Sequence, residues 1–186
     1  MVMFLDFLYI INSLTFSEKH VYLNKLYTMA HYDFRKDLNE GNNGENLVIE
    51  HLKKLGGTLI SKNNDNRFDA IIEVNGKSIK YEIKTDVFCK PTYDTGNLFI
   101  EIECRGKESG ILVTEAEWFV TYYKHLNEIW YIKTPQLLKL IEEHKQNFIF
   151  KTFSGDKGSN TKGWLVPRWK FTDDFLIYNS NTFKKI

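Results

Sequence analysis

Residues 67–86 read RFDAIIEVNGKSIKYEIKTD, a pattern that predicts a β-hairpin and from which the rest of the chain can be interpreted. Residues 68–74 are rich in β-branched and apolar side chains, which favours a strand. Asn75-Gly76 is a strong hairpin signal, because a type I′ turn needs positive φ at both central positions. We therefore expect residues 77–85 to form the returning strand.

Charged side chains of the returning strand should share one face. Because side chains alternate along a strand, Lys80, Glu82 and Lys84 project from one surface and residues 81, 83 and 85 from the other. Asp69 on the first strand would lie nearby. Two carboxylates and an ammonium that converge in this way can hold a hard divalent cation and a phosphate together. The simpler interpretation is a solvated strand face with surface charges.

Composition limits the class of protein. The chain has 186 residues, of which 42% are apolar and 26% charged, as expected for one soluble globular domain. The net charge of +1 provides no global basic field, so a nucleic-acid partner would need a local basic patch. Cys89 and Cys104 are too few for a disulfide framework and indicate reduced thiols in a cytosol-like compartment. The five histidines lack the spacing of a zinc site.

Residues 1–31 are expected to be an N-terminal extension of a single domain that comprises residues 32–186. Residues 1–14, MVMFLDFLYIINSL, are apolar but include Asp6, and they fall short of the roughly 20 residues that span a bilayer. They also lack the basic start and cleavage site of a signal peptide. Two alternatives remain for the extension: a packed helix or strand, or a segment that is poorly ordered or foreign to the native product.

The sequence predicts a loop at residues 39–44 and a helix at residues 45–55 that Gly56-Gly57 ends. At about 100° per residue, the apolar side chains of this helix centre roughly 50° from Glu45 and roughly 165° from Glu50. Glu45 therefore flanks the buried face and can lean over the sheet, whereas Glu50 points to solvent.

The remaining pattern alternates between strands and helices. Residues 58–61, 97–104 and 128–132 are expected to be strands. Thr114 and Glu117 match a capping box, which predicts a helical turn that leads into Trp118. Thr134 and Pro135 open an amphipathic helix that reaches about residue 144. This order predicts one mixed α/β domain.

Glu45, Asp69 and the triplet Glu82-Ile83-Lys84 together resemble the motif of the PD-(D/E)xK nuclease superfamily, which is restriction endonuclease-like. The resemblance covers roughly residues 39–132 and has one departure, because Phe68 stands where the motif has Pro. It implies an αβββαβ core with a central mixed β-sheet flanked by helices.

The resemblance also implies a metal-dependent endonuclease that hydrolyses DNA phosphodiester bonds. Asp69, Glu82 and the Ile83 carbonyl would hold Mg²⁺, for which Mn²⁺ can substitute, and Glu45 would hold a second metal or a metal-bound water. Lys84 would orient the attacking water or neutralise charge on the phosphate. The implied partner is DNA, with no membrane, in the cytoplasm or, for a phage-encoded protein, the host cytoplasm.

Two alternatives to this function remain open at the level of sequence. One is a Holliday-junction-resolving nuclease, which would act as a homodimer. The other is a catalytically inactive nuclease-like module that binds nucleic acid or a protein.

Several polar residues outside the motif are candidate nucleic-acid ligands. A polar loop that leads into a helix start is a plausible phosphate site, and cations mixed with aromatic residues can contact phosphates and bases. The alternatives are an ordinary loop and packed strand residues. The candidates are Lys107, Ser109, Thr114, Lys162 and Arg168, and Glu101 and Glu103 are secondary candidates near the metal.

Overall fold

The computed structural model describes residues 34–62, 67–153 and 160–186. The extension expected at residues 1–31 lies outside the described residues. In the described part of the chain, no helix combines the length and the apolar character needed to cross a membrane.

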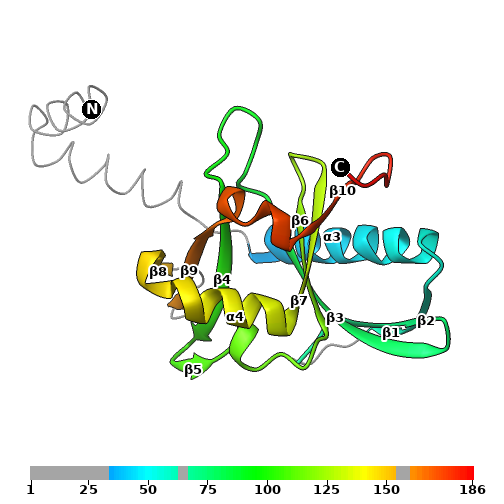
Figure 1. The fold of residues 1–186 in the computed structure, drawn as a ribbon, viewed down its shortest axis with the longest axis horizontal. Coiled ribbons are helices and arrows are strands. Elements are labelled where there is room, and N and C mark those ends of the chain that lie inside the picture. Colours follow the sequence, from blue (N-terminus) through cyan, green and yellow to red (C-terminus); the bar gives the residue numbers. More distant parts are fainter. Residues whose placement is uncertain (1–33, 63–66, 154–159) are drawn as a thin grey trace, which may run out of the picture. The chain divides into compact units, whose positions relative to one another are not determined.

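The described residues form two α-helices and ten strands (Figure 1). The helices are α3 (Phe34–Lys54) and α4 (Thr134–His144). The strands are β1 (Thr58–Lys62), β2 (Ala70–Val74), β3 (Lys77–Asp86), β4 (Asn97–Cys104), β5 (Lys107–Glu108), β6 (Trp118–Tyr123), β7 (Glu128–Lys133), β8 (Ile149–Phe153), β9 (Thr161–Pro167) and β10 (Leu176–Asn179). Short 3₁₀ turns lie at η1 (Gly110–Leu112), η2 (Lys145–Asn147), η3 (Arg168–Lys170) and η4 (Thr172–Asp174).

The central sheet has the strand order β1-β2-β3-β6-β7-β10. All its neighbouring strands are antiparallel except β3 and β6, which run parallel. The predicted hairpin is confirmed: Val74 pairs with Lys77, and the turn residues Asn75 and Gly76 have φ values of 52° and 76°. The sheet is therefore mixed, and the protein belongs to the α/β class.

Side-chain alternation on β6 and β7 divides the core into two halves. Val120, Tyr122 and Tyr131 pack with Val48, Ile49 and Leu52 of α3 on one face of the sheet. On the opposite face, side chains of β6 and β7 pack with α4 and the second sheet; these include Phe119, Tyr123, Trp130, Leu137 and Ile100. β6 is buried on both faces, which explains its nearly continuous apolar sequence.

The prediction of a loop at residues 39–44 is wrong, because α3 continues through them. The two glycines there disfavour a helix by intrinsic propensity, but tertiary packing overrides that preference. Gly44 is buried where α3 meets β3, and a Cβ atom on Gly44 would lie 1.9 Å from Oγ1 of Thr85. Glu40 also pairs with Lys124 at the far end of β6. The predicted end of the helix before Gly56 is confirmed.

The expected helix between the motif strand and β6 is also wrong. Trp118–Tyr123 is strand β6, and the crossover from β3 to β6 instead contains β4, β5 and η1. β4 and β5 belong to a second, antiparallel sheet with the order β5-β4-β9-β8. Thr114 does not cap a helix, since its hydroxyl contacts the Arg67 carbonyl at 2.8 Å. The helix predicted from Thr134 is confirmed as α4, although Lys133, not Thr134, is its N-cap.

A buried aromatic cluster joins the C-terminal strand to α3. His51 is fully buried, its Nδ1 lies 2.7 Å from the Tyr131 hydroxyl, and its ring stacks on Phe183. Burial, together with the charge of Lys54, lowers the pKa of His51 to about 4. His51 is therefore neutral at physiological pH and acts as a packing residue.

The two glycines of α3 provide a matched test of this packing. Gly44→Ala should destabilise the protein by about 1–3 kcal/mol, because the added methyl overlaps the Thr85 side chain. Gly41→Ala should stabilise it by about 0.5–1 kcal/mol, because a Cβ there meets nothing within 4 Å and alanine favours a helix. Urea unfolding of both variants measures the difference. Equal effects of the two substitutions would contradict the close approach of α3 to β3.

Candidate functional site

The candidate site begins where β2 and β3 part. The backbone N–H of Asp69 donates to the Tyr81 carbonyl at 2.8 Å, which is the last backbone contact of this hairpin toward the site. The next bond is made by a side chain, because Ile83 N–H donates to Oδ2 of Asp69 at 2.6 Å. Since the N–H and C=O of one strand residue point to the same side, the Ile83 carbonyl points toward the Asp69 carboxylate as well.

Glu82 and Lys84 project from the same face of β3, as predicted. Glu82 is only 4% exposed, and its Oε1 lies 2.6 Å from Nζ of Lys84. The side chain of Lys84 is 46% exposed, so the ion pair joins a buried carboxylate to a partly exposed lysine. The structure thus brings together Asp69, Glu82, Lys84 and the Ile83 backbone, which the sequence separates by up to 15 positions.

The charges at this site influence one another. Burial raises the pKa of Asp69 to about 6; the charge of Lys84 and the Ile83 N–H oppose this shift, and the charges of Glu82 and Glu45 add to it. Burial lowers the pKa of Lys84, but the charges of Glu82 and Asp69 outweigh it, so that this pKa is raised overall. Lys84 is therefore a cation at neutral pH, beside carboxylates that it does not fully compensate.

Glu45 lies where its phase on the helix predicted. Its side chain is mostly buried and pairs with Lys62 at 3.1 Å, and its charge acts on Asp69. Glu50 is exposed and pairs only locally, with Lys53 at 2.7 Å. The prediction that Glu45 flanks the buried face of the helix and that Glu50 points to solvent is confirmed, because the Glu45 side chain is 22% exposed and that of Glu50 is 59% exposed.

The donor set suits a hard divalent cation, although its side chains are not gathered around one point. Asp69, Glu82 and the Ile83 carbonyl offer oxygen ligands. The pKa of Asp69 is raised mainly by burial and to a smaller extent by the charges of Glu82 and Glu45. Within residues 34–62, 67–153 and 160–186, no three His, Cys, Asp or Glu side chains are close enough to hold an ion together. One oxygen of Glu82 is already paired with Lys84.

Thr114 was expected to contact nucleic acid, but the structure places its hydroxyl at the acid. Its Oγ1 lies 3.2 Å from Oε2 of Glu82 and 2.8 Å from the Arg67 carbonyl. The hydroxyl has a single proton, so it can donate to only one of these two oxygens at a time. Thr114 thus shares its proton between the Arg67 carbonyl and the second oxygen of Glu82, while Lys84 pairs with the first oxygen.

Sequence reasoning missed the ion-pair network that fixes this segment. Glu115 pairs with Arg67 at 3.1 Å and with Lys80 at 2.6 Å, and its N–H donates to the Arg67 carbonyl at 2.7 Å. These contacts join residues 48 and 35 positions apart. The sequence carries no signal for them, because only the parallel pairing of β3 with β6 brings the two segments together.

The other predicted nucleic-acid ligands have diverse surroundings. Lys107 is exposed on β5, whereas the Ser109 hydroxyl oxygen is buried and has no partner among the described residues. Lys162 pairs with Glu103 at 2.6 Å within the second sheet. Glu101, a secondary candidate, adds to the raised pKa of Lys84, so β4 lies near the site.

Arg168 requires a correction, because it is a core residue and not a surface ligand. It is 5% exposed, pairs with Asp94, and stacks its guanidinium 4.4 Å from the ring centre of Tyr123. A buried guanidinium with these partners cannot reach a phosphate. The error arose because a cation between aromatic residues in the sequence fits both a binding surface and a buried cation–π contact.

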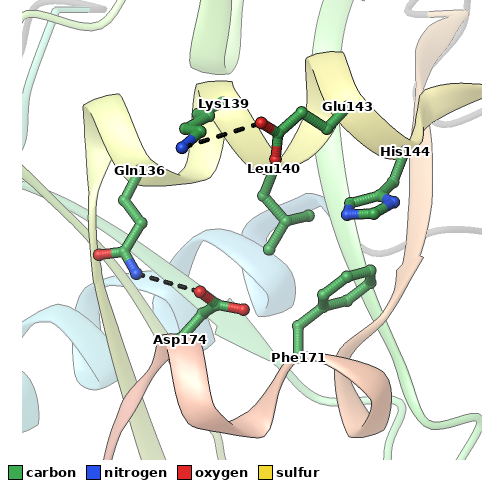
Figure 2. A pocket seen from close by; sticks show the side chains of 7 residues that line it. All are labelled: Gln136, Lys139, Leu140, Glu143, His144, Phe171 and Asp174. Carbon is green, nitrogen blue, oxygen red and sulfur yellow. Dashed lines mark hydrogen bonds and ion pairs between the residues drawn. The ribbon is translucent and has the colours of Figure 1, made fainter.

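A separate hollow lies beside α4 (Figure 2). Its polar walls are largely engaged with one another, through Gln136 with Asp174 at 3.2 Å and Lys139 with Glu143 at 3.8 Å. His144 lies against Phe171 at the other end of the hollow. None of its lining residues belongs to the motif, so we do not assign the chemistry to this hollow.

Comparison of this chain with protein-family models, curated proteins and solved structures found no match.

The raised pKa of Asp69 predicts that ionisation of this carboxyl group lowers the stability of the folded protein. Its folded pKa of about 6 exceeds its ordinary value of 3.8, so the stability that this group contributes is full below pH 3.8 and is lost as the pH rises through 6. Asp69→Asn retains an acceptor for Ile83 N–H and should stabilise the protein by about 1–3 kcal/mol at neutral pH.

Urea unfolding with a chelator present, at neutral pH and at about pH 4, measures this effect. The gain should nearly vanish at the lower pH, and Glu50→Gln on the exposed side of α3 should change little at either. A loss of stability in Asp69→Asn at neutral pH would contradict the electrostatic account.

Proposed function

We propose that this protein is a metal-dependent endonuclease that hydrolyses DNA phosphodiester bonds. The observation that carries the proposal is the meeting of Asp69, Glu82 and Lys84 at the point where β2 leaves β3. Glu82 is buried and charged, and Asp69 replaces a backbone ladder bond with a carboxylate. Groups placed at such a cost to stability are typical of functional sites.

The arrangement of elements supports the same proposal. A helix is followed by three antiparallel strands, and a fourth strand then runs parallel to the third: α3, β1, β2, β3 and β6. This is the order that an αβββαβ restriction endonuclease-like core requires for its helix and four strands. The departure is the crossover, where the second sheet stands in place of the expected helix.

The chemistry follows from the residues of the site. Asp69, Glu82 and the Ile83 carbonyl would hold Mg²⁺, with Mn²⁺ as a substitute, and Glu45 would hold a second ion or a water bound to the first. When bound, such an ion polarises the scissile phosphate and lowers the pKa of its water. Lys84 remains protonated at neutral pH and neutralises charge that develops on the phosphate oxygens. Thr114 holds Glu82 in place from the other side.

A catalytically inactive nuclease-like module is the second candidate, and one observation favours it. Both oxygens of Glu82 have partners in the chain, Lys84 and Thr114, so that metal binding would have to displace Lys84 from Oε1. Under this proposal the protein would bind DNA without cutting it.

Lys84→Ala should lower metal-dependent DNA cleavage by at least about a hundredfold, because it removes the one cation that pairs with the buried acid. A panel of linear duplex, nicked, single-stranded, flapped and four-way DNA, with Mg²⁺ or Mn²⁺, measures the effect. Lys77→Ala, on the same strand but at the hairpin tip, is the matched control and should cleave normally.

Preference for four-way DNA would identify a junction-resolving enzyme. Wild-type protein that binds but never cleaves would identify the inactive module.

Glu45 and Glu50 form a second matched pair, since both are acids of the same helix. Glu45→Gln should reduce cleavage by about tenfold or more and raise the Mg²⁺ concentration required, because it removes a carboxylate that acts on Asp69. Glu50→Gln should leave both unchanged, because its side chain faces solvent. Titration of Mg²⁺ in the cleavage assay compares the two variants. Equal cleavage rates and equal Mg²⁺ requirements of the two variants would contradict a role for Glu45 at the site.

A further inference from the structure

Three aromatic side chains stand exposed on two segments, the one that follows β3 and η3. Phe88 and Tyr93, in the segment between β3 and β4, are 72% and 70% exposed, and Trp169 in η3 is 63% exposed. They are three of the four most exposed large hydrophobic side chains in the described part of the chain. Exposure of single apolar residues is common, but three large rings on neighbouring segments call for a physical reason.

The segment that carries Phe88 and Tyr93 is held by its own hydrogen bonds. Oδ1 of Asp86 accepts from the N–H groups of Phe88 and Cys89 at 2.9 and 2.7 Å, as expected of a turn residue. Lys90 and Tyr93 then exchange two backbone hydrogen bonds, at 3.1 and 2.9 Å. Cys89 is buried beneath them. The aromatic side chains are thus displayed on a fixed backbone.

Buried Arg168 joins this segment to Trp169. Its backbone N–H donates to the Gly96 carbonyl at 2.9 Å, and its guanidinium pairs with Asp94. Trp169 consequently lies against Gly96, where a Cβ atom would be 3.0 Å from Cδ1 of the indole. In Figure 1 the loop between β3 and β4 rises beside η3, although the two are about 70 residues apart in sequence.

The charges around these rings favour an anionic aromatic ligand. Lys90 and Lys170 are exposed at the same segments, and Nζ of Lys170 lies 5.1 Å from the ring centre of Trp169. The two acids there are engaged, Asp86 by backbone N–H groups and Asp94 by Arg168. Flat rings beside ammonium groups match a nucleotide chain, in which bases stack and phosphates pair with cations.

We propose that Phe88, Tyr93 and Trp169, with Lys90 and Lys170, form a stacking surface for unpaired bases of single-stranded DNA. The segment that carries Phe88 and Tyr93 follows Asp86, the last residue of β3 and two positions beyond Lys84, so these rings come directly after the candidate site in the chain. Bases in a duplex are already stacked and paired and cannot cover these rings. From this surface we also infer that the preferred substrate is DNA with a single-stranded segment, and this part rests on the proposed endonuclease function. The stacking of bases on the rings does not depend on that function.

Binding of a fluorescein-labelled oligo(dT) of about 15 nucleotides tests this surface by fluorescence anisotropy in the presence of a chelator. Trp169→Ala and Tyr93→Ala should each weaken binding by on the order of tenfold, and Trp169→Phe should retain most of the affinity. Phe150→Ala, which removes an exposed aromatic ring on edge strand β8, is the matched control and should bind as wild type. A blunt hairpin duplex should bind more weakly than oligo(dT) and be insensitive to these substitutions.

Equal oligo(dT) affinity in wild type, Trp169→Ala and Tyr93→Ala would overturn the proposal. So would a change of oligomeric state by Trp169→Ala in sedimentation, with unchanged DNA affinity, since the surface would then contact a second copy. Thermal unfolding of each variant checks that the fold persists. The two proposals fail separately. Oligo(dT) binding that does not depend on the rings, together with metal-dependent cleavage, rejects this surface alone. Ring-dependent oligo(dT) binding without metal-dependent cleavage rejects the endonuclease alone.

Discussion

The hydrogen bond from Ile83 N–H to the Asp69 carboxylate, 2.6 Å long, lies where the fold and the candidate site meet. Up to Tyr81, β3 is held by the backbone of β2; beyond it, a side chain makes the next bond. The hairpin therefore opens at this point, and β3 continues with β6 as its partner. Glu82 and Lys84 lie on the part of β3 beyond the opening, so the open edge and the charged residues occupy the same place.

Electrostatics at this opening oppose stability and favour a ligand. Asp69 is mostly buried near Glu82 and Glu45, and Lys84 compensates only part of the negative charge. In a protein selected for stability alone, apolar side chains would serve better at such positions. In the proposed function, a bound cation would offset the repulsion among these carboxylates.

The second sheet packs on the central sheet and positions residues both in the core and at the surface. It takes the place expected for a crossover helix, covers one face of the central sheet through Leu98 and Ile100, and brings Glu101 near Lys84. Arg168, the first residue of η3 directly after β9, is buried against Tyr123 and holds the segment after β3 through Asp94. A residue expected to contact nucleic acid thus acts from the interior, and the adjacent Trp169 remains at the surface.

The hairpin, the helix α4 and the different orientations of Glu45 and Glu50 could be predicted without a structure, because each depends on local rules. Asn75-Gly76 has few alternatives to a tight turn, and Pro135 favours a helix start. The period of 3.6 residues separates Glu45 from Glu50 without knowledge of the fold. These signals lie within about ten residues of one another, so no distant contact was needed to interpret them.

Contacts between distant segments determine the helical conformation of residues 39–44 and the strand conformation of Trp118–Tyr123. They also determine the surroundings of Thr114 and Arg168. Gly44 is helical because its lack of a side chain allows α3 to pack closely against Thr85 of β3. The six residues from Trp118 form a strand because other elements pack on both faces of it. Thr114 has a capping pattern, yet its hydroxyl contacts groups 32 and 47 positions away. Contacts between distant segments outweigh the local preference for a loop or a helix, which is about 1 kcal/mol. A local sequence pattern cannot predict those contacts.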